Sequence, residues 1–482
     1  MEADYEATIG LEIHAELKTL TKMFCDSPND PDENEPNKNV CPVCLAHPGT
    51  LPVVNREAVR QVLRVGIALG SDLADYTEFD RKNYFYPDQP KGYQLSQFEF
   101  PLVSGGELRG VSITRIHLEE DTASSIHDEA SGATLIDYNR SGVPLMELVT
   151  DPVIKSAEEA GAFARELQIL LRTLGASEAN MEKGQMRVEA NVSVAKKGTR
   201  SSAYVEIKNL NSFKAMERAV EYEIKRQSRM LDRGEVLVKQ TLGWDEGKQA
   251  TFPQRTKEGS ADYRYFPDPD IPSLKLSEMP EYEKSSLEIG MPELPNAKRA
   301  RYLALGINPE DVEMYIRDVV LGRFFEEVAA SLKDDKTIKL ASNYIANDLV
   351  KIIRDSGKRD TDLTADNPIF IPISVDNFSE IIEMISKAEI SSRSGKNLLV
   401  LAVSDTRRPR LIAEESKLLQ NNSAQDFEPI LNKLIKDNPG VVDDYKAGKT
   451  VALEYLVGQA MKALRGAADP NVLRSMLLER LK

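Results

Sequence analysis

Cysteine and histidine are scarce in this chain of 482 residues, which contains three cysteines and four histidines. Three cysteines cannot form the framework of several disulfides on which small secreted domains depend. The chain also opens without the apolar stretch and small-residue cleavage site of a secretory signal. These absences predict a protein of a reducing compartment, and we expect it to be cytoplasmic.

Long apolar runs and an excess of positive charge are also lacking. No run of about 18 apolar residues occurs, so the pattern excludes a membrane-spanning helix. The chain has 62 Lys and Arg against 77 Asp and Glu, which gives a formal net charge of −15. Such a chain repels nucleic acid on average, so any nucleic-acid site has to be local.

Several common catalytic motifs are missing. The sequence has neither the G-x-x-x-x-G-K-[ST] loop nor G-x-G-x-x-G, so a P-loop or Rossmann nucleotide site is not supported. It also lacks the G-x-S-x-G turn of a serine hydrolase, and its cysteines have no glutaminase-like context. If the reaction uses ammonia, another chain has to supply it.

Three parts of the chain differ in their sequence patterns. Residues 1–294 alternate period-2 runs with turn signals and contain one helix with both caps written in the sequence, from Ser156 to Gly175. This mixture predicts an α+β domain with a largely antiparallel sheet. Residues 295–406 have helical periods and predict a helical domain, and residues 407–482 predict a small helical tail domain.

The tail also differs in charge. From Arg407 onward there are 13 Lys and Arg against 10 Asp and Glu. One interpretation is that these are ordinary solvated helix faces. The other is a tail that contacts a polyanion.

Short strands with one polar and one apolar face recur in the first part. Four of them carry polar residues at alternating positions: Glu12, His14 and Glu16; Arg115, His117 and Glu119, followed by Glu120; Arg187, Glu189, Asn191 and Ser193; Tyr204, Glu206 and Lys208. A single such strand is typical of the wet face of an antiparallel sheet. Four together favour a concave site in which carboxylates hold Mg²⁺ and the Arg and Lys side chains contact phosphate. The sequence therefore predicts a sheet-borne site for Mg–ATP.

The three cysteines form a CxxC pair, Cys41 and Cys44, with Cys25 upstream. Structural zinc sites use four ligands, and this region offers three thiols with His47 or Asp26 as the only candidates for a fourth. A zinc site and a set of reduced, part-buried thiols both remain open.

The segment from Asp80 to Pro101 is dense in aromatic and ionic residues. It interleaves tyrosines such as Tyr84 with Lys82 and Lys91, and its prolines forbid a regular helix. Such a loop either fills an aromatic and polar core or forms a surface for binding and conduction.

Long stretches of the chain resemble one family, that of the B and E subunits of tRNA-dependent amidotransferases. The matching text, in order, is GLEIHAELKT, CPVCLAHPGTLPVVNREAV, DRKNYFYPDQPKGYQLSQ, HLEEDTASSIHD, DYNRSGVPLMELVTDP, ANMEKGQMRVEANVSV, EIKNLNSF, DYRYFPDPDIP and DDYKAGKTVALEYLVGQAMKALRG. The match runs nearly from end to end and is least distinct in the helical middle. The resemblance implies a glutamine-synthetase-like cradle, a helical domain and a tail domain that binds tRNA.

The family resemblance also implies an activity. A B subunit uses Mg–ATP to phosphorylate the side-chain carboxylate of Glu or Asp on a misacylated tRNA(Gln) or tRNA(Asn). Ammonia then displaces the phosphate, after an amidase-type A subunit has released it from glutamine. A small C subunit fastens the A and B subunits together.

The resemblance assigns roles residue by residue. Catalysis would involve Glu12, His14, Glu189 and Glu206, and the Mg²⁺ ligands would be these four with Glu119 or Glu120. The strand pattern adds Arg115, Arg187 and Lys208 as phosphate contacts. The ammonia channel would pass Lys82, Tyr84 and Lys91. Some relatives have a second cysteine where this chain has Ser27, a departure that bears on zinc binding at Cys25, Cys41 and Cys44.

Two other functions fit part of the sequence. One is an ATP-dependent amide ligase for a free amino acid, which has no need of the tail from Arg407 to Lys482. The other is a noncatalytic scaffold that brings an amidase to RNA, for which Glu12 and His14 have no chemical role.

Overall fold

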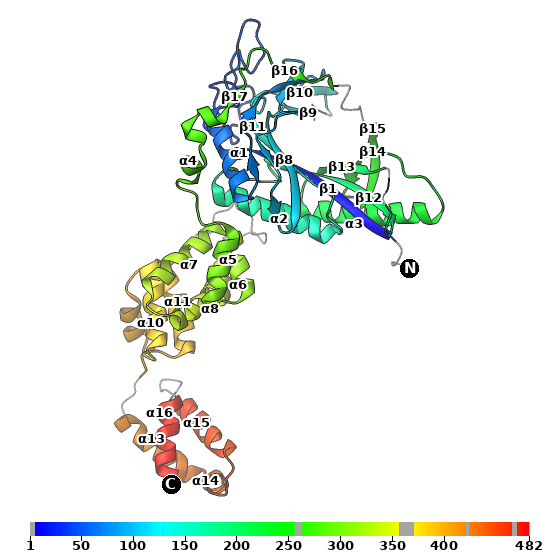
Figure 1. The fold of residues 1–482 in the computed structure, drawn as a ribbon. Helices are drawn as coiled ribbons and strands as arrows, with labels where there is room; N and C mark the ends of the chain where they lie inside the picture. Colours follow the sequence, from blue (N-terminus) through cyan, green and yellow to red (C-terminus); the bar gives the residue numbers. More distant parts are fainter. Residues whose placement is uncertain are drawn as a thin grey trace. The chain divides into compact units, whose positions relative to one another are not determined.

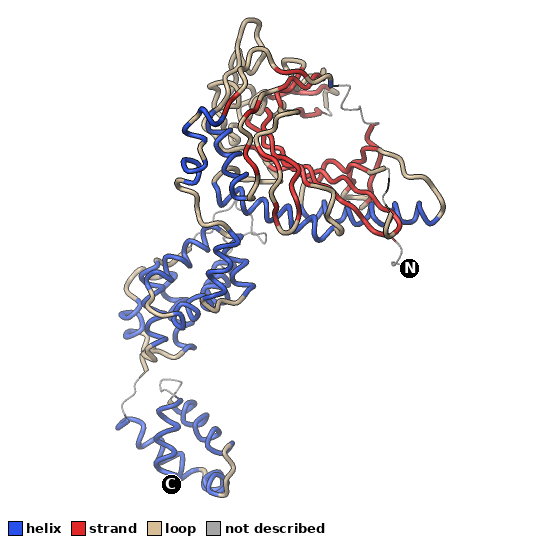
Figure 2. Tube along the Cα trace, in the orientation of Figure 1, coloured by secondary structure: helices blue, strands red, loops and turns tan. Residues whose placement is uncertain are grey.

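The structure, a computed structural model, describes residues 5–128, 130–199, 201, 203–255, 263–355, 371–420, 424–464 and 470–481. The chain divides into two compact units, residues 1–295 and 296–482. Strands occur in the first unit, and the second is helical (Figures 1 and 2). The fold is therefore of mixed helix and sheet, as the sequence predicts, while the three-domain boundaries stay a prediction.

The first unit is built on one large sheet. Its strands are β1 (Tyr5–Glu16), β2 (Asp72–Leu73), β6 (Val103–Ser104), β7 (Glu107–Leu108), β8 (Val111–Glu120), β11 (Pro144–Thr150), β12 (Met186–Lys196), β13 (Val205–Leu210), β14 (Gln240–Asp245) and β15 (Ala250–Arg255). The smaller sheets use β3 (Tyr76–Thr77), β4 (Asp80–Asn83), β5 (Tyr93–Ser96), β9 (Ser124–Asp128), β10 (Ala133–Asp137), β16 (Phe266–Pro267) and β17 (Leu274–Lys275).

The order of the large sheet is β15-β14-β13-β12-β1-β11-β8-β6-β2, with β7 paired to β8. All its pairs are antiparallel except β13 with β14. The largely antiparallel sheet predicted from the sequence is thus confirmed. The four polar strands belong to this sheet, and β11 separates β1 from β8.

The helices of the first unit are α1 (Arg56–Ala68), α2 (Ala157–Leu174), α3 (Phe213–Asp232) and α4 (Lys284–Glu288), with 3₁₀ turns at Leu276–Glu278 and Pro280–Tyr282. Helix α2 has the predicted caps. The Ser156 hydroxyl accepts a hydrogen bond from the Glu159 amide at 3.1 Å, and Gly175 ends the helix at φ 68°. Glycine suits that left-handed position because it has no Cβ.

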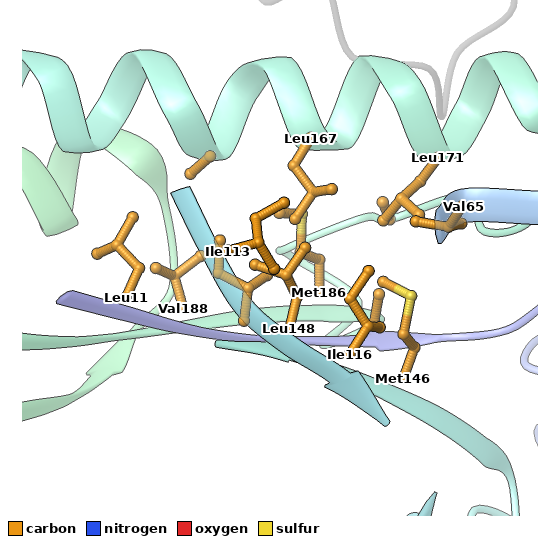
Figure 3. Packing of buried hydrophobic residues seen from close by; sticks show 14 of the residues in the cluster. Leu11, Val65, Ile113, Ile116, Met146, Leu148, Leu167, Leu171, Met186 and Val188 are labelled. Atoms are coloured by element: carbon orange, nitrogen blue, oxygen red, sulfur yellow. The ribbon is translucent and has the colours of Figure 1, made fainter. Parts of the chain in front are cut away.

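The core of the first unit lies between the sheet and these helices. Figure 3 shows Leu167 and Leu171 of α2 directed at Leu11, Leu148 and other apolar residues of the central strands. All four of these leucines are fully buried. One face of the sheet is therefore dry, and its alternate residues lie on the opposite face.

The second unit contains helices α5 (Pro295–Ala304), α6 (Pro309–Arg317), α7 (Val319–Ser331), α8 (Asp335–Tyr344), α9 (Val350–Asp355), α10 (Val375–Ser386), α11 (Ser392–Ser404), α12 (Pro409–Glu415), α13 (Ala424–Asp437), α14 (Pro439–Lys446), α15 (Val451–Ala463) and α16 (Pro470–Leu481), with a π-helical turn at Ile345–Leu349. No helix in the described ranges combines the length and apolarity that a bilayer crossing requires. The predicted caps Gly466 and Asp469 lie outside the described residues.

Helices α13 to α16 share a core of their own, which includes the fully buried Leu431, Leu456 and Leu473. Residues 407–420, by contrast, are bonded to the preceding helices. The Gln420 amide donates to the Glu389 carbonyl at 2.7 Å, and the Asn377 side-chain amide donates to the Arg407 carbonyl at 3.3 Å.

We expect Leu167→Ala to lower the free energy of unfolding of the first unit by about 2–5 kcal/mol, because it leaves a cavity between α2 and the sheet. The single tryptophan, Trp244, lies buried on β14 and reports on this unit by fluorescence during urea unfolding. Val236→Ala, at a position that is 81% exposed, should change stability by less than about 0.5 kcal/mol. Equal effects of the two substitutions would contradict this packing.

Candidate active site

The register of the central strands brings charged side chains from neighbouring strands together. Strand β1 lies between β11 and β12. On β12, Glu189 faces Glu12 and Arg187 faces His14, and on β11 Glu147 faces His14. Because facing residues lie on the same side of a sheet, these five side chains share its polar face.

Three carboxylates form a compact group, which we call the carboxylate triad: Glu12, Glu189 and Glu206. Their oxygens lie within 4.8 Å of one another. The Lys208 ammonium is 2.7 Å from Glu189 and 3.7 Å from Glu206. Burial, followed by the charges of Glu147 and Glu189, raises the pKa of Glu12. Negative charge is therefore concentrated here, and oxygen ligands of this kind suit a divalent cation such as Mg²⁺.

A second group lies next to the triad and is called here the histidine group: His14, His117, Glu119 and Glu147. His14 Nε2 is 3.5 Å from Glu119 and 3.4 Å from Glu147, and His117 Nε2 is 3.3 Å from Glu147. Burial favours neutral His14, but the hydrogen bond and charge of Glu147 and the charge of Glu119 outweigh it and raise the pKa of His14 to about 9. The carboxylates thus favour a cation at this point.

Glu119 and Glu120 are placed differently, which separates two candidates that the sequence left as alternatives. Glu119 belongs to the histidine group and accepts a hydrogen bond from the Ser96 hydroxyl at 3.2 Å. Glu120 instead accepts a hydrogen bond from the Lys91 ammonium at 2.6 Å and another from the Leu95 backbone amide at 2.9 Å. Consecutive residues of a strand point to opposite faces, so only Glu119 lies with the proposed metal ligands.

Two of the three predicted channel residues, Lys82 and Tyr84, lie close enough to Glu119 to interact with its charge. The Lys82 ammonium is 6.0 Å from the ring centre of Tyr84 and 5.1 Å from that of Tyr263. Burial opposes its charge, but Glu119, Tyr265 and other neighbours hold the pKa of Lys82 above its usual range. The third residue, Lys91, is paired with Glu120 at 2.6 Å.

The predicted phosphate contacts have different surroundings. Arg187 makes two hydrogen bonds of 3.0 Å to the buried Asp121. Although burial opposes ionisation, Arg187 and Arg140 lower the pKa of Asp121 to about 2. Arg115 lies at a loose 3.9 Å from Glu147. Of the three predicted phosphate contacts, Lys208 therefore lies at the carboxylate triad. Arg187 instead pairs with a carboxylate of the protein, that of Asp121.

Glu16 shares the polar face but belongs to neither group. Burial and the nearby charge of Asp121 raise its pKa to about 8, against the opposing effect of Arg187. The carboxyl group is therefore largely protonated at neutral pH.

The three cysteines gather as the motif predicts. Their sulfurs lie within 4.8 Å of one another, and the Cys41 and Cys44 sulfurs are 3.8 Å apart. The Ser27 hydroxyl and the buried Lys22 ammonium lie 3.7 and 3.8 Å from Cys44. Within the described residues no fourth metal-ligating side chain joins the group. The donor set is one short of a structural zinc site, and zinc binding stays a prediction.

Two residues of the site were missed by sequence reasoning. Glu147 links His14 with His117, and Asp121 holds Arg187. Glu147 is the one charged residue in the apolar strand PLMELVT, and a lone acid in a strand buried on both sides is a signal that would have identified it.

The fold and the site define a class of protein in which one face of a large antiparallel sheet presents clustered carboxylates with lysines among them. Two family models match the chain: the GatB/GatE catalytic domain over residues 7–280 and the GatB domain over residues 323–481. The chain belongs to the GatB/GatE family.

Full-length relatives agree with these matches. The B subunit of the aspartyl/glutamyl-tRNA(Asn/Gln) amidotransferase of Thermus thermophilus is 42% identical over 482 residues, and that of Carboxydothermus hydrogenoformans is 39% identical over 492, each alignment covering 99% of both chains. The B subunit of a chloroplastic/mitochondrial glutamyl-tRNA(Gln) amidotransferase of Oryza sativa is 39% identical, with 99% of this chain and 88% of the relative covered.

Arg187→Met should lower the free energy of unfolding by about 2 kcal/mol, because it leaves the buried Asp121 carboxylate with Arg140 alone. Lys225→Met, which removes an exposed ion pair with Glu221, should cost less than about 0.5 kcal/mol. Urea unfolding followed by Trp244 fluorescence measures both. An unchanged free energy of unfolding in Arg187→Met would contradict the stabilising role of its pair with Asp121.

Proposed function

We propose that this chain is the B subunit of a glutamyl-tRNA(Gln)/aspartyl-tRNA(Asn) amidotransferase, an ATP-dependent carbon–nitrogen ligase that uses glutamine as the amide donor. It amidates the side-chain carboxylate of Glu or Asp on a misacylated tRNA, so that Gln-tRNA(Gln) or Asn-tRNA(Asn) is available for translation. Full-length similarity to relatives with this name supports the proposal. The observation that carries it is the carboxylate triad with Lys208, next to the histidine group.

The residues of the site fit ATP and Mg²⁺. Glu12, Glu189 and Glu206 would hold the metal, with His14 and Glu119 of the neighbouring group as further ligands. The raised pKa of Glu12 supports this assignment, since burial and then the charges of Glu147 and Glu189 disfavour its carboxylate, which a bound cation would stabilise. When bound, Mg²⁺ offsets the negative charge of phosphoryl oxygens.

The protein side chains have distinct tasks in this proposal. A carboxylate is a poor acyl donor because its leaving group would be oxide, and phosphorylation supplies a better one. Lys208 neutralises charge at the triad, while Arg115, at the rim near Glu147, is placed to contact a phosphate. Lys82 and Tyr84, which interact with the charge of Glu119, would line the path by which ammonia arrives without crossing bulk water.

The complex has further components in this proposal. No hydrolase motif in the sequence releases ammonia from glutamine, so an amidase-type A subunit does so, and a small C subunit holds the two larger subunits together. We also propose that residues 1–294 form the glutamine-synthetase-like cradle. The tail helices α13 to α16, which share one core, contact tRNA.

Glu12→Gln and His14→Ala should each reduce amide formation by about 100-fold or more, which corresponds to about 3 kcal/mol of transition-state stabilisation. Hydrolysis of glutamine by the A subunit in the same complex should continue. Glu16→Gln is the matched control, because a protonated carboxyl group and an amide have nearly the same shape and charge. A scaffold function predicts that all three variants remain active.

Removal of residues 424–482 should raise the KM for aminoacyl-tRNA by at least about tenfold and leave the KM for ATP unchanged, since the cut removes only the helices that share the tail core. Steady-state kinetics of the complex with both substrates tests this. An unchanged KM for tRNA would favour a ligase that acts on a free amino acid.

A further inference from the structure

The three cysteines gather around the end of a lysine side chain, and we call these four residues the thiol cluster: Lys22, Cys25, Cys41 and Cys44. The three sulfurs lie within 4.8 Å of one another. The Lys22 ammonium lies 3.8 Å from the Cys44 sulfur and donates a hydrogen bond to the Tyr138 carbonyl at 3.1 Å. All four residues lie between β1 and α1 in the chain, so the cluster is separate from the carboxylate triad.

Lys22 is a buried cation whose charged neighbours are sulfurs. Its side chain is fully buried, and among the described residues no carboxylate forms an ion pair with it. Burial lowers the pKa of Lys22, and the charges of the three cysteines oppose this effect. A buried ammonium is stable only when an anion lies next to it, and the anion that fits here is a thiolate.

Cys44 carries the sulfur at which the donors of the cluster meet. The Cys41 backbone amide donates a hydrogen bond to this sulfur at 3.1 Å. The Ser27 hydroxyl lies 3.7 Å from it, and the Lys22 ammonium lies 3.8 Å from it. A sulfur that faces an amide, a hydroxyl and an ammonium has the surroundings of a reactive thiolate rather than those of an inert buried thiol.

The same residues do not fit a structural zinc ion, which takes four nitrogen, sulfur or carboxylate ligands. The neighbour of Cys44 that completes the group is the Ser27 hydroxyl, which is not among these ligands. His47 lies in the wall of the adjoining cavity, but its ring nitrogens are not among the ligand atoms that lie within 4.8 Å of one another. The positive charge beside the Cys44 sulfur therefore comes from Lys22.

A cavity of about 220 Å³ adjoins the cluster, and its wall includes Cys25 and Cys44. Typical ligand sites begin at about 300 Å³, so this cavity admits a small oxidant but not a peptide or a protein disulfide. The Cys41 sulfur is part-exposed and lies 3.8 Å from that of Cys44. The two residues are joined by a turn, in which the Leu45 amide donates to the Cys41 carbonyl at 3.0 Å. Rotation of the two side chains is enough to bring the sulfurs to the bonding distance of about 2.05 Å.

We propose that Cys44 and Cys41 form a site of reversible oxidation by a hydroperoxide and hold no zinc ion. With hydrogen peroxide, the Cys44 thiolate attacks one oxygen, the O–O bond breaks, and a sulfenic acid and a hydroxide form. The hydroxide takes a proton from solvent and becomes water. The Cys41 thiol then attacks the Cys44 sulfur, the S–O bond breaks, and the hydroxide that leaves takes the thiol proton as water.

The two sulfurs together lose two electrons, which reduce the peroxide to water. A small dithiol reverses the reaction by thiol–disulfide exchange, which the partial exposure of Cys41 permits. This chemistry does not depend on the proposed function, because only the thiol cluster takes part.

Hydrogen peroxide is the probe, and the purified full chain, prepared without chelator, is the sample. Elemental analysis measures zinc, a thiol titration counts free cysteines, and non-reducing peptide mapping locates the disulfide. We expect no bound zinc and a fall from three free thiols to one, with the bond between Cys41 and Cys44. Dithiothreitol should restore all three thiols.

Three variants separate the roles of the residues. Lys22→Met keeps the length of the side chain but removes its charge, and it should slow the oxidation of Cys44 at least about tenfold. Cys41→Ser should stop at the sulfenic acid, which dimedone labels on Cys44. Cys25→Ser, the matched control, should still form the disulfide.

Other results overturn the proposal. One zinc ion per chain that protects the thiols from peroxide would show a metal site, and a disulfide that includes Cys25 would show a different reactive pair. An unchanged oxidation rate in folded Lys22→Met would show that the ammonium does not activate Cys44. If Lys22→Met fails to fold, as judged by its Tm, the zinc content and the disulfide of the wild type decide the question.

Discussion

The site depends on the pairing of β1 between β11 and β12. The odd-numbered residues Leu11 and Ile13 are fully buried against the helices, and this fixes which side of the strand is dry. A slip of one residue would turn Glu12 and His14 into the core and Leu11 into the polar face, at a prohibitive cost in desolvation. The hydrophobic contacts with α2 therefore set the register that brings the charged groups together.

The negative charge of the carboxylates on the polar face is balanced in two ways. Lys208 places its ammonium group at the carboxylate triad, and the charge of Lys82 interacts with that of Glu119. Asp121, by contrast, is neutralised within the protein by Arg187 and Arg140. The first arrangement leaves negative charge that a metal can offset, whereas the second is a closed structural pair. This difference separates groups available for chemistry from groups that support the sheet.

The proposed function has two regions. The triad would hold the metal, and the region around Lys82 and Tyr84 would admit ammonia. The triad lies on the large sheet, so the spacing of its carboxylates follows from strand separation and from the rise along each strand. Lys82 lies on β4 of a smaller sheet, so its place near Glu119 depends on how the two sheets pack.

Several features follow from local sequence alone. Alternation with period two is a property of the strand itself, so the polar faces of GLEIHAEL and QMRVEANVSV are visible without a structure, and the caps of α2 are equally local. The gathering of the three cysteines was indicated by their spacing.

Only the tertiary structure decided the rest. The sequence does not say that β11 separates β1 from β8, so Glu147 was missed although it lies at the centre of the histidine group. It could not separate Glu119 from Glu120, because the side of a strand that faces a site depends on its neighbours. It also assigned Arg187 to phosphate, whereas the fold pairs it with Asp121, 66 residues away. Residue parity is local, but strand order and register arise from long-range packing, and these determine which charges meet.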